Sequence, residues 1–158
     1  MIAGVPVGKE IPGDEPYANL TAPNLPGSEM KGDVGSIIIV IATDAPLLPH
    51  QLKRLARRAS LGLARTGSIS GNGSGDIFIA FSTANSGASK PSGIRHLDMV
   101  PNDEMDPLFK ATVEATEEAI VNAMVGAETM TGIDGHTVIA LPHDKLREVL
   151  KKYNRLDH

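Results

Sequence analysis

The chain has 158 residues, the length of about one domain, which is enough to bury a substantial core without disulfide bonds. Its 15 lysines and arginines against 19 aspartates and glutamates give a net charge of −4, which favours neither a nucleic acid nor an anionic membrane as a partner. The sequence contains no cysteine, and this excludes thiolate metal sites and a cysteine nucleophile. No apolar run approaches the roughly 20 residues that a membrane-spanning helix needs.

The first 35 residues form a segment rich in proline and glycine. They hold five prolines and six glycines and show no helical or strand period, so we expect an extended loop or linker. A compact domain rarely contains a structureless loop of this length. We therefore expect the segment either to be disordered or to cross a neighbouring part of a larger protein.

From residue 37 onward, short aliphatic runs are expected to be strands, and stretches with apolar side chains every three or four positions are expected to be helices. The first run has no polar alternation, which is typical of a strand buried on both faces. Gly67 is expected to end the first helix. The predicted strands are 37–42, 77–83 and 136–141, and the predicted helices are 49–64, 106–127 and 142–153. This alternation predicts an α/β or layered α+β fold.

A glycine-rich turn at 71–76 superficially suggests a phosphate-binding loop. A dinucleotide-binding loop follows a strand and opens a helix, whereas this turn leads into a strand. A tight turn before a strand is therefore the simpler interpretation. Within the turn, Ser74 and Asp76 are spaced i and i+2, which puts both side chains on one face if strand pairing begins there.

Basic residues and histidines form two further patterns. The first predicted helix carries a basic face made of Lys53, Arg54, Arg57, Arg58 and Arg65. A solvated face, or one paired with acidic groups, is the favoured interpretation, with nucleic-acid or membrane binding as the alternative. The five histidines form no helical i, i+4 pair and no HExxH motif. A metal site would need carboxylates to complete it, and we expect neither a metal nor a cofactor.

Gly35 and Ser36 stand where the flexible segment meets the first predicted strand. From spacing alone they are an ordinary start of a strand. The same arrangement is also what a self-cleaving enzyme with an N-terminal nucleophile requires, because the serine hydroxyl can attack the unhindered glycine carbonyl and convert the peptide to an ester. The new terminal amine, with a pKa near 8, can then act as a base beside its own hydroxyl.

Two long stretches carry a resemblance to a known enzyme family. The stretch GDVGSIIIVIATDAPLLPHQLKRLARRASLGLARTGS, followed by GNGSGDIFIAFSTAN, closely resembles the L-aminopeptidase D-amidase/D-esterase family, which includes the β-peptidyl aminopeptidases. The stretch NAMVGAETMTGIDGHTVIALPHDKLREVL resembles the C-terminal end of that family, and IAGVPVG resembles a segment from the interior of the family's precursor. The resemblance extends over essentially the whole chain.

The resemblance implies a fold and a division of the chain. The implied fold is α/β (α+β layered), as part of an αββα sandwich whose chain topology is shared with ornithine acetyltransferases. Self-cleavage would fall between Gly35 and Ser36. It would separate residues 1–35, a linker and the end of an α-subunit-like part, from 36–158, a β-subunit-like catalytic portion.

The same resemblance implies roles for three residues. Ser36 corresponds to the nucleophile, Ser74 to the second family serine that contacts it, and Asp76 to the acidic position beside that serine. A chain of hydrogen bonds through these residues would give the hydroxyl a route for its proton. The implied activity is that of an aminopeptidase, amidase or esterase on small peptides or aminoacyl amides. Ornithine acetyltransferases use threonine at the cleavage point, so Ser36 favours the hydrolase over an acyltransferase, which stays open.

The chain also departs from the family pattern. The family precursor is more than twice as long, and its N-terminal half supplies an asparagine that stabilises the oxyanion and a tyrosine that contacts the substrate. Neither Tyr17 nor Asn19 lies in a motif that lets it replace them. We therefore expect the N-terminal half (α subunit) of the same precursor as a partner, and a homo-oligomer; an inactive truncated fragment or structural subunit is the alternative. The expected compartment is the cytoplasm, with the periplasm open because a signal could precede Met1.

Overall fold

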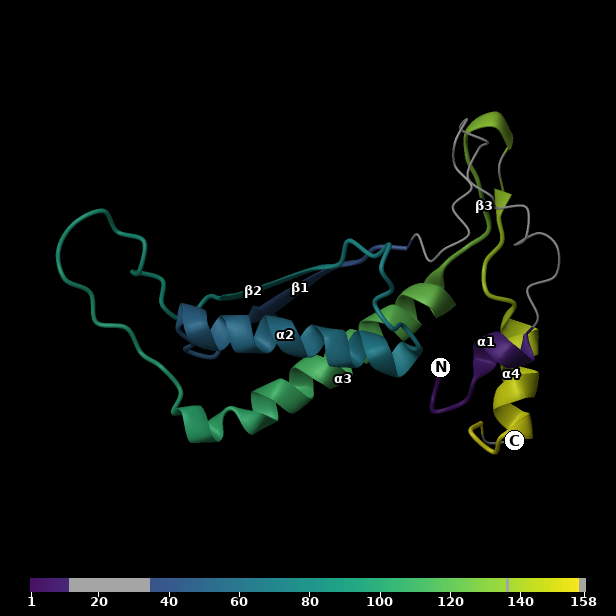
Figure 1. Ribbon diagram of the computed structural model, residues 1–158, viewed down its shortest axis with the longest axis horizontal. Helices are drawn as coiled ribbons and strands as arrows, with labels where there is room; N and C mark the ends of the chain where they lie inside the picture. Colours follow the sequence, from purple (N-terminus) through teal and green to yellow (C-terminus); the bar gives the residue numbers. More distant parts are fainter. Residues whose placement is uncertain (12–34, 136, 157–158) are drawn as a thin grey trace. The chain divides into compact units, whose positions relative to one another are not determined.

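The structure is a computed structural model, and it describes residues 1–11, 35–135 and 137–156. The chain divides into two compact units (Figure 1). The described residues of Met1–Lys31 and Ala119–His158 make up one, which we call the terminal unit. Those of Gly32–Glu118 make up the other, the strand unit.

Some of the sequence predictions concern residues outside the described ranges. Most of the predicted linker lies there, including Tyr17 and Asn19, and so does His136. The division of the chain into 1–35 and 36–158 concerns processing, and it stays a prediction.

The elements follow the predicted alternation of strands and helices, with short additions. Gly67 ends the first long helix in the left-handed conformation, at φ 116°, as predicted. The additions are a four-residue helix near the N-terminus, a two-residue strand and two short 3₁₀ helices. In chain order the elements are α1 (Val7–Glu10), β1 (Ile38–Thr43), α2 (Pro49–Thr66), β2 (Ile77–Ser82), η1 (Asn102–Glu104), α3 (Asp106–Gly126), β3 (Met130–Thr131), η2 (Ile133–Gly135), β4 (Thr137–Val138) and α4 (His143–Lys152).

Strands β1 and β2 form a parallel pair, with a register that runs from Ile38 opposite Ile77 to Thr43 opposite Ser82. The pairing confirms the prediction that these two strands are neighbours in one sheet. Parallel strands need a crossover connection, and α2 provides it, running alongside both strands (Figure 1). The register brings the starts of the strands together, because the Ile77 N–H donates to the Ile37 carbonyl at 3.0 Å.

Two helices cover one face of this sheet within the strand unit. Gly62 on α2 lies so close to α3 that an added Cβ would meet the Val113 carbonyl oxygen at 2.5 Å and the Thr116 Cβ at 2.6 Å. The absence of a side chain at this position therefore allows the two helices to pack. The core of the unit is formed by buried residues from the loop before α2, from α2, from the junction between η1 and α3, and from α3: Leu47, Leu55, Met105 and Phe109.

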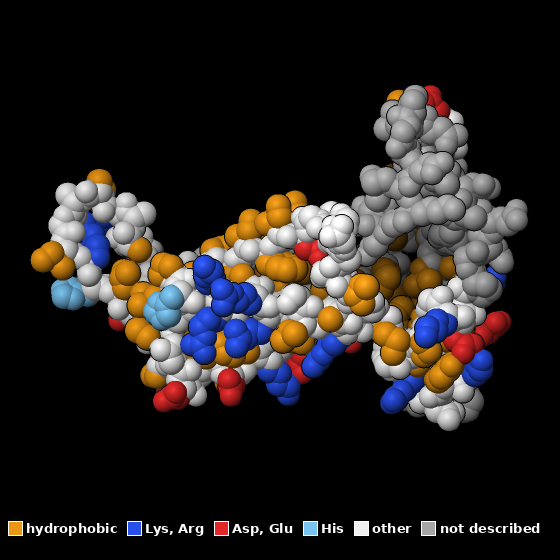
Figure 2. Space-filling view, in the orientation of Figure 1, with side chains coloured by type: hydrophobic (Ala, Val, Ile, Leu, Met, Phe, Trp, Pro, Cys, Tyr) orange, Lys and Arg blue, Asp and Glu red, His pale blue; other side chains and the backbone are white. Residues whose placement is uncertain are grey.

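The opposite face of the sheet is exposed, and this corrects the prediction that the first strand is buried on both faces. Side chains alternate along β1 and β2 between half-buried and exposed. Figure 2 shows hydrophobic side chains along the strands. Within the strand unit, α2 and α3 lie on one side of the sheet, and no described residue of this unit covers the second apolar face. Its large members and their exposed fractions are Ile38 67%, Val40 58%, Ile77 52%, Ile79 49% and Phe81 45%.

The third predicted strand, 136–141, is also corrected. Among the described residues of this range, only Thr137–Val138 forms a strand, and it pairs antiparallel with Met130–Thr131 rather than with β1 or β2. These strand residues are exposed. The intervening turn includes Asp134 and Gly135, both with positive φ. A turn of this kind pairs neighbouring segments locally, which an aliphatic pattern alone does not indicate.

The terminal unit joins the two ends of the chain around a small core. Val5, just before α1, and Val7, the first residue of α1, pack against Leu146 and Val149 of α4, and Val5 is only 1% exposed. Outside this core, Glu10 accepts hydrogen bonds from Lys152 Nζ at 2.7 Å and from the Tyr153 hydroxyl. Part of the predicted linker is therefore ordered structure, tied to the last helix.

Candidate active site around Ser36

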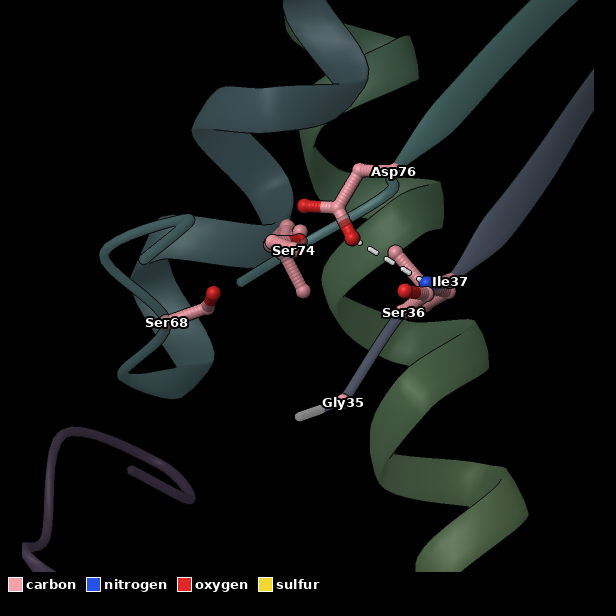
Figure 3. A pocket seen from close by; sticks show the side chains of 7 residues that line it. Gly35, Ser36, Ile37, Ser68, Ser74 and Asp76 are labelled. Atoms are coloured by element: carbon pink, nitrogen blue, oxygen red, sulfur yellow. Dashed lines mark hydrogen bonds between the residues drawn. The ribbon is translucent and has the colours of Figure 1, made fainter. Parts of the chain in front are cut away.

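An open pocket of about 230 Å³ lies at the paired starts of β1 and β2 (Figure 3). The parallel register explains its location, since Ser36 precedes β1 and Asp76 immediately precedes β2. Residues from the end of the N-terminal segment, from α2 and from the glycine-rich turn line it: Gly35, Ser36, Ile37, Leu63, Ser68, Ser74 and Asp76. All three residues predicted to be catalytic therefore surround one pocket, although 38 and 40 residues separate Ser74 and Asp76 from Ser36 in sequence.

The Ser36 hydroxyl is held by the glycine-rich turn. The Gly75 N–H donates to Ser36 Oγ at 2.9 Å. A Cβ at position 75 would lie 3.2 Å from the same oxygen, so the close approach suits a residue without a side chain. Because Oγ accepts this bond, the hydroxyl proton stays available for donation, and the amide dipole favours negative charge on the oxygen.

Asp76 holds the backbone immediately after Ser36. Its Oδ1 accepts the Ile37 N–H at 3.1 Å, as the dashed line in Figure 3 shows, and its Oδ2 accepts the Ser70 hydroxyl at 3.2 Å. Hydrogen bonding from Ser74 is the largest cause that lowers the pKa of Asp76; partial burial opposes it, and the Ile37 amide and the Ser70 hydroxyl lower it further. Asp76 is therefore a carboxylate at neutral pH.

The hydrogen bonds differ in one respect from the predicted proton route. The Ser74 side chain lowers the pKa of Asp76, but among the described residues no hydrogen bond joins Ser36 directly to Ser74. The contact to Ser36 Oγ comes instead from the amide of Gly75, the residue between the two. The structure thus places the three side chains around one pocket without completing the chain between them.

Sequence reasoning missed several groups at the site. Backbone donors such as the amides of Gly75 and Ile37 leave no signature in the sequence, because every residue except proline has one. Ser70 was also missed, since a serine immediately before a glycine-rich turn is typical of the turn itself. The signal that identifies it is structural: its φ of 48° and its bond to Asp76.

The predicted basic face has partners within the strand unit. Lys and Arg side chains gather over α2 in Figure 2. Arg65 pairs with Glu117 at 3.1 Å, and the Arg58 guanidinium lies 3.6 Å from the centroid of the Phe109 ring. Arg54 donates to the Asn102 side-chain oxygen at 3.0 Å. These contacts support the interpretation of a helix face that is solvated or paired.

Residues 1–138 match peptidase family S58. The chain belongs to this family. It is 50% identical to the β-peptidyl aminopeptidase BapA of Sphingosinicella microcystinivorans over 98% of the chain and 40% of that relative. The chain therefore spans about two fifths of the length of this relative.

Two solved structures are similar to the chain. One is the L-aminopeptidase D-Ala-esterase/amidase of Ochrobactrum anthropi, described as a prototype serine aminopeptidase with a variant of the Ntn hydrolase fold. It has a TM-score of 0.80 and 46% identity, over 99% of this chain and 40% of that one. The other is a β-aminopeptidase of a Burkholderia species, with a TM-score of 0.71 and 40% identity, over 96% and 40%. The fold is thus α/β, layered and of Ntn hydrolase type.

The described residues contain neither a candidate membrane-spanning helix nor a candidate metal site. No helix there is both long and apolar enough to cross a membrane. In the same residues, no three side chains of histidine, aspartate or glutamate come together as metal ligands.

Proposed function

We propose that this chain is the nucleophile-bearing part of a family S58 serine aminopeptidase that cleaves itself between Gly35 and Ser36. The observation that carries the proposal is a pair of hydrogen bonds that fix the Ser36 hydroxyl and the backbone immediately after it. The hydroxyl oxygen accepts the Gly75 amide at 2.9 Å, and the amide of the next residue is fixed by the Asp76 carboxylate at 3.1 Å. A serine that merely opened a strand would need neither contact.

The first reaction is an N-to-O acyl shift at the Gly35–Ser36 bond. Ser36 Oγ attacks the Gly35 carbonyl carbon, the C–N bond breaks, and the proton lost by the hydroxyl ends on the new Ser36 amine. The product is an ester between Gly35 and Ser36 Oγ. Water hydrolyses this ester, which returns the serine hydroxyl and leaves a carboxylate on Gly35.

The second reaction uses the freed N-terminus. With a pKa near 8, the Ser36 amine accepts the proton of its own hydroxyl as Oγ attacks a substrate carbonyl. The substrate amine or alcohol leaves with a proton, and water then hydrolyses the acyl-enzyme. Asp76 holds the Ile37 amide throughout, and Ser74, which lines the same pocket, lowers the pKa of that carboxyl. The proposed substrates are small peptides and aminoacyl amides or esters with a free amine.

The proposal includes a partner. The chain spans about 40% of the length of its relatives, and the sheet that carries Ser36 leaves a large apolar face exposed. Uncovered apolar surface of this kind drives association. We propose that the N-terminal half of the same precursor covers this face and supplies the missing donor to the oxyanion, a contribution commonly worth about 10²–10³ in rate.

Co-expression with an N-terminal half from the BapA relative tests this proposal. Hydrolysis of an aminoacyl amide is expected from the complex and only weakly from the chain alone. Asp76→Asn keeps the shape of the side chain but removes its charge, and it should lower the activity of the complex by about tenfold, because a neutral amide oxygen accepts the Ile37 hydrogen bond more weakly than a carboxylate does. A complex that forms and processes itself but hydrolyses no aminoacyl amide or ester would contradict the proposed activity.

A further inference from the structure

The side chain of Ser70 occupies an unusual position beside the pocket. Its backbone lies in the left-handed region at φ 48°, which serine adopts rarely. Its N–H donates to the Ser68 hydroxyl at 3.1 Å, which stabilises this bend locally. The bend aims the Ser70 hydroxyl at Asp76 Oδ2, at 3.2 Å and across six residues of the turn.

The two oxygens of Asp76 therefore hold different partners. Oδ1 receives the Ile37 amide beside the nucleophile, and Oδ2 receives the hydroxyl of Ser70. A carboxylate bonded through one oxygen alone can rotate about its Cβ–Cγ bond, because this torsion is broad. Bonds to both oxygens restrict that rotation and keep Oδ1 aimed at the amide.

We propose that Ser70 is a positioning residue for the reaction at Ser36: its hydroxyl orients Asp76 so that the carboxylate fixes the backbone immediately after the nucleophile. Ser70 acts through Asp76 and does not touch the reacting atoms. The consequence for catalysis rests on the proposed function, whereas the orientation of Asp76 does not. A purely structural role in the turn is the competing explanation, and it concerns only the backbone conformation at this position.

Three substitutions at Ser70 distinguish the effect of its hydroxyl from the effect of its backbone conformation. Ser70→Gly removes the hydroxyl and adopts a positive φ without strain, whereas Ser70→Ala removes it and keeps the strain. Ser70→Asn restores a hydrogen-bond donor in a residue that tolerates the left-handed region. If the turn alone matters, the glycine variant behaves like the parent; if the hydroxyl matters, glycine and alanine are both defective and asparagine is at least partly restored. Ser89→Gly is the matched control, since Ser89 is exposed in a loop away from the pocket.

The first measurement does not depend on cleavage. In a Ser36→Ala background, NMR follows the titration of the Asp76 carboxyl and the shift of the Ile37 amide. The pKa of Asp76 is set by hydrogen bonding from Ser74, by partial burial, and by hydrogen bonds from the Ile37 amide and the Ser70 hydroxyl. No charged side chain of the described residues is among these causes. Ser70→Gly is expected to raise the pKa of Asp76 and to move the Ile37 amide signal, and Ser70→Asn to reverse part of both. Unchanged values in Ser70→Gly would overturn the proposal.

The second measurement is the rate of cleavage at Gly35–Ser36, followed by intact-mass spectrometry. Loss of one hydrogen bond is expected to slow cleavage by about two- to tenfold in Ser70→Gly and Ser70→Ala, and Ser89→Gly is expected to match the parent. Parental rates in Ser70→Gly would overturn the positioning role. A parent chain that never cleaves, either alone or with the N-terminal half bound, in spite of shifted NMR signals in Ser70→Gly, would count against the proposed function and leave the orientation of Asp76 by Ser70 established.

Discussion

The terminal unit and the strand unit of this protein differ in how completely they bury their apolar side chains. In the terminal unit, Val5 and Val7 near the start of the chain are buried against Leu146 and Val149 near its end. The strand unit buries one face of its sheet under α2 and α3 and leaves the other exposed, with Ile38 at 67%. The unit that carries the candidate nucleophile is therefore the one that leaves a large apolar face exposed.

The largest expected effect is that of removing the attacking oxygen. Ser36→Ala should abolish both cleavage at Gly35–Ser36 and any hydrolysis, because alanine has no nucleophile. The melting temperatures of both units should stay close to those of the parent, since alanine still fits before a strand. Calorimetry and intact mass of the same sample check both statements, and cleavage that persists in this variant would refute the assignment of Ser36.

Substitution of one valine in each unit tests the comparison between the units most directly. Val5 is 1% exposed in the terminal unit, and Val40 is 58% exposed on the open sheet face. Val5→Asp should cost about 3–5 kcal/mol, because it buries an unpaired charge. Val40→Asp should change the stability of the chain alone by no more than about 0.5 kcal/mol, yet prevent binding of the N-terminal half.

Denaturant unfolding and size-exclusion chromatography with the co-expressed half measure the two effects of the valine pair. Val40→Ile serves as the control, because it keeps the face apolar and should bind. Equal destabilisation by both aspartates would show that the sheet face is covered within the chain itself.

A substitution at the close contact between α2 and α3 should have a smaller effect on stability, confined to the strand unit. Gly62→Ala would gain about 1 kcal/mol of helix propensity. The new Cβ, however, would meet the Val113 carbonyl oxygen at 2.5 Å, and backbone cannot move aside as a side chain tip can. Overpacking should win, with a net loss of about 1–3 kcal/mol. Thermal unfolding checks this, and a stabilised variant would mean that the helices pack less closely.

The smallest expected effect is a pH dependence in the terminal unit. Hydrogen bonds first from Lys152 and then from Tyr153 lower the pKa of Glu10. A lowered folded pKa means that this contribution is complete above the unfolded value of about 4.3 and is lost as the pH falls through the folded pKa. The protection factors of residues 1–11 against hydrogen exchange, which are corrected for the intrinsic effect of pH, should therefore fall in acid.

Glu10→Gln separates this effect from general acid unfolding. The variant should protect residues 1–11 less than the parent at neutral pH and should show no further loss between about pH 5 and pH 2. Protection in the strand unit should be unaffected at neutral pH. The same acid-induced loss in the glutamine variant would show that another group controls the docking of the N-terminus.

The two units were also predictable to different degrees. Aliphatic runs, Pro49 and Gly67 indicated β1, α2 and β2 almost to the residue, because strand and helix signals here are local. The open sheet face was not predictable, since an apolar pattern reports which side chains avoid water and not whether the chain itself supplies their cover. The docking of α1 on α4 depends on contacts across more than 140 residues, as in the bond between Glu10 and Lys152, and no local pattern reports these.

The groups of the candidate site also differ in how far the sequence could predict them. Ser36, Ser74 and Asp76 were indicated by spacing and by family resemblance, and the structure brings them to one pocket. The amide of Gly75 and the hydroxyl of Ser70 could not be found in this way. One belongs to the backbone, and the other depends on a left-handed bend that serine rarely adopts.

Intact-mass spectrometry of the purified chain tests the central claim, that Ser36 is a self-processing nucleophile. We predict two products, 1–35 and 36–158, whose masses sum to that of the parent plus one water, with Ser36 as the new N-terminus. Cleavage should appear in the chain itself or on addition of the N-terminal half, and not with Ser36→Ala. An intact mass that persists with the N-terminal half bound would contradict the account.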